Sequence, residues 1–157
     1  MPKERAAAFR YVRALWLSLR EARPQVQLIF VLRFATAAAL ALLSGAAPGP
    51  TIVAGAAAWF LLTWAIYLVN GIGDIVEDRA NGSARPIARG DLSPAAASRI
   101  ACGLSVAGLA VAAAVSPLLV LLGAGQLLLG WAYSMGLAPL KRVTAQAVVA
   151  VVLAKAC

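Results

Sequence analysis

An amide and two carboxylates recur at four-residue intervals where a long apolar segment ends. Asn70, Asp74 and Asp78 stand at i, i+4 and i+8, so a continuing helix places all three on one face, with about 6 Å of rise between neighbours. Oxygen donors suit a hard divalent cation, and Mg²⁺ usually brings phosphate oxygens with it. The spacing therefore predicts a site for a magnesium-bound diphosphate, with Asp74 and Asp78 as metal ligands beside Asn70. The alternative is that these acids only solvate a loop.

Basic and aromatic side chains accompany this acidic stretch. Cationic groups on the same side of the apolar segments are candidates to hold non-bridging phosphate oxygens, namely Arg85, Arg89, Lys141 and Arg142. Aromatic faces can stabilise an allylic cation through cation–π attraction, and the candidates for this pocket are Trp64, Tyr67 and Tyr133. Aromatic residues in membrane helices also serve as packing or as interface belts, and that interpretation stays open.

The elements that must position these groups are apolar helices. Of the 157 residues, 62% are hydrophobic and only 13% are charged, against about 25% charged in soluble domains. A membrane span needs about 20 residues. Four segments satisfy this length and a fifth is shorter, over residues 24–43, 51–70, 95–115, 117–137 and 143–157. The sequence predicts an all-α, multi-pass transmembrane bundle.

The distribution of basic residues explains the net charge of +8. Residues 1–23 hold Lys3, Arg5, Arg10, Arg13, Arg20 and Arg23, while most others lie in the loops over 71–94 and 138–142. The positive-inside rule places the N-terminus and the acidic-motif loop in the cytoplasm. This charge faces anionic lipid, and no nucleic acid partner is expected because no soluble domain carries it. Residues 1–23 form either a helix in the membrane interface or a solvated basic helix.

Several residues narrow the chemistry further. Histidine is absent and Cys102 and Cys157 form no ligand spacing, which excludes a zinc site of ordinary type. Arg33 lies about ten residues into the first span, where an unpaired charge usually marks function. It either contacts phosphate or snorkels to the interface.

Motifs downstream make the combination specific. Arg85-Pro86 with Gly90 forms a compact basic loop, and Tyr133-Ser134 with Lys141 follows the fourth span. Together with Asn70, Asp74 and Asp78, in this order, they make the sequence resemble the UbiA superfamily of intramembrane prenyltransferases over residues 24–157. Members carry an N-D-x-x-D-x-x-x-D motif, then R-P-x-x-x-G, then a Tyr-Ser and Lys motif.

The resemblance implies a nine-helix fold around a cavity and Mg²⁺-dependent transfer of a prenyl group from its diphosphate, commonly to an aromatic acceptor. Asn70, Asp74 and Asp78 would serve the Mg²⁺-diphosphate, with Lys141 and Arg85 as phosphate contacts. Two departures stand out: Gly71 replaces the first Asp of the motif, and members are roughly twice as long, with a second Asp-rich motif.

We therefore expect residues 24–157 to represent about five helices, the N-terminal half of such an enzyme in the cell membrane, following the basic segment 1–23. A chain of this kind would be inactive alone and need a complementing chain or self-association. Alternatives are a UbiA-type terpene cyclase half and a non-catalytic transporter or assembly fragment. The motif orders of CDP-alcohol phosphotransferases and of soluble prenyl synthases are absent.

Overall fold

The computed structural model describes residues 2–47, 49–135, 139, 141, 149 and 152–153. All regular structure in this part of the chain is helical, as predicted. The helices are α1 Pro2–Glu21, α2 Pro24–Leu43, α3 Pro50–Gly73, α4 Ile75–Ala80, α5 Pro86–Arg89, α6 Pro94–Val115 and α7 Pro117–Ser134.

Proline and serine set where these helices begin. Helices α2, α3, α5, α6 and α7 all start with proline, whose fixed φ suits the first helical position and whose missing N–H costs nothing there. Ser93 Oγ accepts a hydrogen bond from the Ala96 amide at 3.2 Å, and Ser116 Oγ accepts from the Leu119 amide at 3.1 Å. Both serines are N-caps that satisfy an amide left without a helical partner.

Four of the helices are long and apolar enough to cross a membrane: α2, α3, α6 and α7, with 20, 24, 22 and 18 residues. Their bounds confirm the first four predicted spans to within three residues at each end. The fifth predicted span, which begins at residue 143, lies almost entirely outside the described residues.

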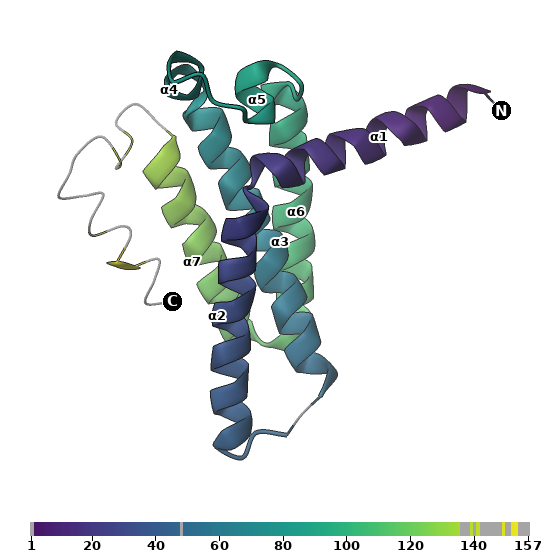
Figure 1. The fold of residues 1–157 in the computed structure, drawn as a ribbon. Helices are drawn as coiled ribbons and strands as arrows, with labels where there is room; N and C mark the ends of the chain where they lie inside the picture. Colours follow the sequence, from purple (N-terminus) through teal and green to yellow (C-terminus); the bar gives the residue numbers. More distant parts are fainter. Residues whose placement is uncertain are drawn as a thin grey trace.

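Helix α3 is the centre of the bundle and packs against α2, α6 and α7 (Figure 1). Leu62 of α3 is fully buried, and glycines on the neighbouring helices admit it. A Cβ on Gly108 of α6 would lie 2.8 Å from Leu62, and one on Gly123 of α7 would lie 2.7 Å from it. Small residues at such contacts allow helices to approach closely. The van der Waals packing that results contributes to helix association in lipid.

Helix α1 runs across one end of the bundle and projects beyond it (Figure 1). Leu17, Ser18 and Glu21 near its C-terminal end are buried. Leu17 joins Ile87, Leu92 and Ala97 in a small apolar core. Farther out, Phe9 and Trp16 are 71% and 59% exposed. Large exposed apolar side chains among basic ones are typical of a helix lying in a membrane interface.

Candidate functional site

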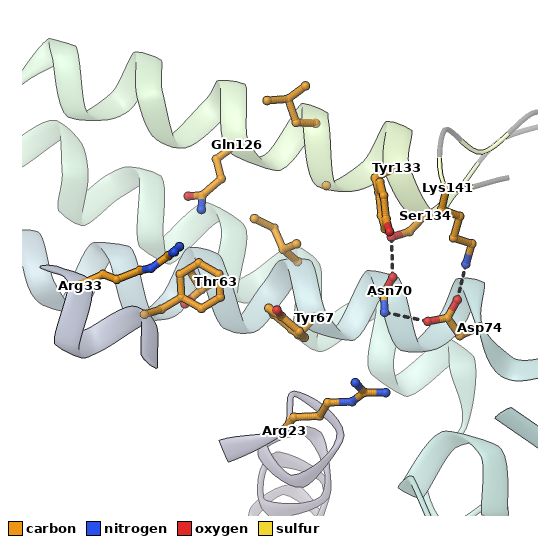
Figure 2. A pocket seen from close by; sticks show the side chains of 14 residues that line it. Arg23, Arg33, Thr63, Tyr67, Asn70, Asp74, Gln126, Tyr133, Ser134 and Lys141 are labelled. Atoms are coloured by element: carbon orange, nitrogen blue, oxygen red, sulfur yellow. Dashed lines mark hydrogen bonds and ion pairs between the residues drawn. The ribbon is translucent and has the colours of Figure 1, made fainter. Parts of the chain in front are cut away.

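A cavity of about 530 Å³ lies between α2, α3 and α7. Its long axis follows α3, with Arg33, Thr63 and Gln126 at one end, Tyr67 in the middle, and Asn70, Asp74 and Lys141 at the other (Figure 2). We call the part formed by Asn70, Asp74, Ser134 and Lys141 the Asp74 end. Apolar side chains complete the wall, namely Phe30, Ile66 and Leu129.

A hydrogen-bonded chain organises the Asp74 end. Ser134 Oγ of α7 donates to Asn70 Oδ1 at 3.0 Å, and Asn70 Nδ2 donates to Asp74 Oδ2 at 2.7 Å. The Lys141 ammonium contacts the other carboxylate oxygen, Asp74 Oδ1 (Figure 2). Because Ser134 donates to the amide oxygen, the amide NH₂ of Asn70 faces Asp74. Asn70 of α3 and Lys141 therefore contact the Asp74 carboxylate directly, and Ser134 of α7 is linked to it through Asn70.

The regular α-helix is interrupted at Asp74, between α3 and α4. Helix α3 ends at Gly73 and α4 begins at Ile75, yet the Asp74 amide donates to the Asn70 carbonyl at 2.9 Å and the Asp78 amide to the Asp74 carbonyl at 2.8 Å. The helical hydrogen-bond spacing therefore continues on both sides of the break. Asn70 and Asp74 meet as the i, i+4 spacing predicts, while Asp78 interacts with a neighbouring arginine instead of lining the cavity.

That arginine is Arg85, which joins three carboxylates behind the Asp74 end. Its NH1 lies 2.7 Å from Asp78 Oδ2 and 3.8 Å from Asp74 Oδ2, and its NH2 lies 2.7 Å from Glu21 Oε1. Arg85 is 8% exposed and Glu21 is 0% exposed. Counting Lys141, three carboxylates face two cations in these ion pairs, and the charge of Arg23, which lines the cavity, also acts on Glu21.

Glu21 ties α1 to the basic loop. Its Oε2 accepts a hydrogen bond from the Ile87 amide at 2.9 Å, and its backbone carbonyl accepts one from Arg85 NH2 at 3.4 Å. Burial raises the pKa of the Glu21 carboxyl, while the Ile87 hydrogen bond and the Arg85 charge act in the opposite direction.

Two glycines in the motif make room for these contacts. A Cβ on Gly71 would clash with Glu21 Oε1 and lie 2.7 Å from Arg85 NH2, and a Cβ on Gly73 would clash with the Ser134 carbonyl oxygen. Glycine is usually unfavourable inside a helix. The tertiary role of these two glycines is to admit the ion pair on one side of α3 and the end of α7 on the other.

The other end of the cavity is lined by polar groups among aromatic ones. Arg33 lies over the Phe30 ring, 5.9 Å from its centroid, and Tyr67 meets the same ring edge-on at 6.0 Å. Thr63 donates to Gln27 Oε1 at 3.0 Å. Gln126 is 5% exposed, and its Oε1 has no hydrogen-bond partner among the described residues.

The predicted site residues that the structure describes fall into three groups. Asn70, Asp74, Lys141, Tyr67 and Tyr133 line the cavity. Asp78 and Arg85 lie directly behind it in the ion-pair cluster. Trp64 is not among the lining residues and packs against Phe60, with ring centroids 5.7 Å apart. Arg142 lies outside the described residues.

Sequence reasoning missed Glu21, Arg23 and Gln126. The signal for Gln126 was a lone amide in an apolar span, where a polar side chain needs a partner or a cavity. Glu21 and Glu4 are the acids of the basic segment 1–23, but nothing local links Glu21 to residues 64 to 66 positions later.

The donor chemistry at the Asp74 end suits Mg²⁺ without forming a closed metal cage. Among the described residues, no group of three or more His, Cys, Asp or Glu side chains is placed to hold a metal ion. Asp74 offers carboxylate oxygens at the cavity and Asp78 offers them directly behind it, while the Asn70 amide oxygen accepts from Ser134 in the free protein. Mg²⁺ commonly takes one or two carboxylates and completes its shell with water and substrate phosphate.

Four candidate membrane helices, three of which enclose a cavity with acidic and basic groups at one end, define a multi-pass membrane protein. Residues 31–157, well over half of the chain, match the UbiA prenyltransferase family, and the chain belongs to this family. No curated protein and no solved structure gives a significant match.

Proposed function

We propose that the chain binds a magnesium-complexed isoprenoid diphosphate at the Asp74 end of the cavity and serves the transfer of its prenyl group to a small, often aromatic, acceptor within the membrane. The observation that carries this proposal is the contact of Asp74 with Lys141 at one end of a cavity whose middle is walled by apolar and aromatic side chains. A charged head and a hydrocarbon tail need these two environments side by side.

The head group would be held by residues of both charges. Asp74 and Asp78, with Asn70, would hold Mg²⁺, which when bound stabilises the charge on departing pyrophosphate. Lys141 and Arg85 would bind phosphate oxygens through charge-assisted hydrogen bonds. Lys141 already lies on Asp74 in the cavity wall, and Arg85 lies directly behind it on Asp78, so both cations are close to the place where phosphate would arrive.

The prenyl tail would extend along α3 towards Phe30. Ile66 and Leu129 provide apolar contact, and Tyr67 and Tyr133 present aromatic rings near the Asp74 end (Figure 2). An allylic cation that forms as pyrophosphate leaves is stabilised by such ring faces. The enclosing helices would keep water from that cation.

The orientation and division of the chain follow from charge. We propose that residues 1–23 form a basic interfacial segment and residues 24–157 a membrane domain, with the N-terminus and the α4–α5 loop on the cytoplasmic side of the cell membrane. The Asp74 end then faces the compartment that supplies water-soluble diphosphates and Mg²⁺.

Binding by the purified chain in lipid nanodiscs tests the proposal. We expect geranyl diphosphate to bind only with Mg²⁺, and more tightly than inorganic pyrophosphate, because the tail adds apolar burial. Asp74→Asn should weaken this binding at least about 100-fold, since it removes a metal ligand and the partner of Lys141. The matched control is Asp91→Asn, whose carboxylate is 39% exposed and pairs with Arg89 away from the cavity.

Two results would contradict the proposal. One is binding that does not require Mg²⁺, and the other is an Asp74→Asn variant that binds as tightly as the Asp91→Asn control.

A further inference from the structure

The space beside Gly71 is filled by a carboxylate from another helix. Glu21 Oε1 lies where a side chain at position 71 would begin, in contact with the same Arg85 NH2 that such a side chain would meet. Gly71 and Glu21 are both buried. Position 71 directly follows Asn70 and lies one helical turn from Asp74 and Ile75, so a carboxylate there belongs to the surroundings of the proposed diphosphate site.

We propose that Glu21 supplies to this site the carboxylate that position 71 lacks, acting as the positioning residue for Arg85. The inference rests on the proposed function, because the purpose of the positioning is magnesium-diphosphate binding. Glu21 holds NH2 of the guanidinium, so that NH1 faces Asp78 and Asp74. An arginine fork fixed at one end presents the other with a defined direction.

The charge balance shows why the carboxylate matters. With Glu21 ionised, the ion-paired groups Glu21, Asp74, Asp78, Arg85 and Lys141 have one net negative charge, which the nearby Arg23 guanidinium offsets. Without that charge these surroundings are net positive, which disfavours Mg²⁺. NH2 of Arg85 then keeps only its hydrogen bond to the Glu21 backbone carbonyl, which leaves the guanidinium freer to turn towards Asp78 and Asp74. Arg85 then competes with the metal for its ligands.

The two oxygens of Glu21 have separable roles. Oε2 accepts from the Ile87 amide and anchors the basic loop to α1, whereas Oε1 faces Arg85. Glu21→Gln keeps an amide oxygen for Ile87 and removes the charge from Arg85. A purely architectural role would therefore survive this substitution, and a positioning role would not.

The test moves the carboxylate from α1 to α3. Four proteins are compared in nanodiscs with wild type: Glu21→Gln, Glu21→Ala, Gly71→Asp and the double variant Glu21→Ala/Gly71→Asp. The measurements are the Mg²⁺ dependence of geranyl diphosphate binding and the melting temperature, with Asp91→Asn as the control for loss of a surface carboxylate.

We expect Glu21→Gln to lower the Mg²⁺ affinity about 10- to 100-fold, the usual cost of losing a group that orients metal ligands, with a melting temperature close to wild type. Gly71→Asp alone should be unstable and bind poorly, because its side chain collides with Glu21. The double variant should bind better than either single variant, because the new carboxylate enters the vacated space beside Arg85.

The inference is overturned if Glu21→Gln binds like wild type, or if the double variant is no better than Gly71→Asp. Absence of Mg²⁺-dependent binding in wild type would refute the proposed function instead. The melting temperatures then test the shared space alone: mutual rescue in the double variant supports a carboxylate from α1 in place of one at position 71, and additive losses refute it.

Discussion

Lys141 offers a sharp test of how the Asp74 end works, because the proposed mechanism gives it opposite effects on two ligands. In the free protein its ammonium contacts Asp74, so it competes with Mg²⁺ for that carboxylate. In the complex it would bind phosphate. We therefore predict that Lys141→Met tightens binding of Mg²⁺ alone and weakens binding of magnesium-diphosphate.

The magnitude follows from the burial of the pair. Lys141 and Asp74 are 15% and 23% exposed, so solvent screens their contact only in part. A hydrogen bond to a charged group contributes about 1.5–3 kcal/mol, and about 1.4 kcal/mol corresponds to a tenfold change in affinity. Removing the competing ammonium should tighten Mg²⁺ binding about 10- to 100-fold, and removing the phosphate contact should weaken geranyl diphosphate binding by a similar factor.

Isothermal titration of nanodisc-embedded protein measures both ligands directly, first with Mg²⁺ alone and then with geranyl diphosphate at saturating Mg²⁺. Arg89→Met is the matched control, because Arg89 is 58% exposed and pairs with Asp91 outside the cavity. An equal loss of affinity for Mg²⁺ and for geranyl diphosphate would refute the proposal that Lys141 exchanges Asp74 for phosphate. An unchanged affinity for Mg²⁺ alone would refute it too.

Two further predictions concern the cavity wall. Gly130→Val should destabilise the bundle by about 1–3 kcal/mol and reduce tail binding, since a Cβ at position 130 would lie 2.7 Å from Ile66; thermal unfolding measures this, and Gly125→Ala, which meets nothing within 4 Å, should be close to neutral. Ser134→Ala should cost about 1 kcal/mol of stability by removing the donor to Asn70, and a Mg²⁺ affinity that stays at the wild-type value would show that the orientation of that amide is unimportant.

Much of the architecture was readable from local sequence. Helix length, apolar composition and proline at helix starts are local properties, so the bounds of α2 and α6 were predicted to within one residue. The pairing of Asn70 with Asp74 was predictable for the same reason, since a four-residue spacing along one helix is itself a contact.

The partners that come from distant segments were not predictable in this way. Glu21 reaches Arg85 across 64 positions, and Lys141 reaches Asp74 across 67. The positive-inside rule predicted these groups on one side of the membrane, but only packing decides which cation meets which carboxylate. The interruption of the helix at Asp74 was not predicted either. After it, Asp78 contacts Arg85 and does not line the cavity.

The sequence by itself determined that this chain is a helical membrane protein with an amide and a carboxylate in contact at the end of a span, because periodicity and hydropathy act within single segments. Only the tertiary structure decided that a carboxylate from α1 fills the space beside Gly71. That outcome depends on how closely two helices approach, and a residue without a side chain makes the approach possible.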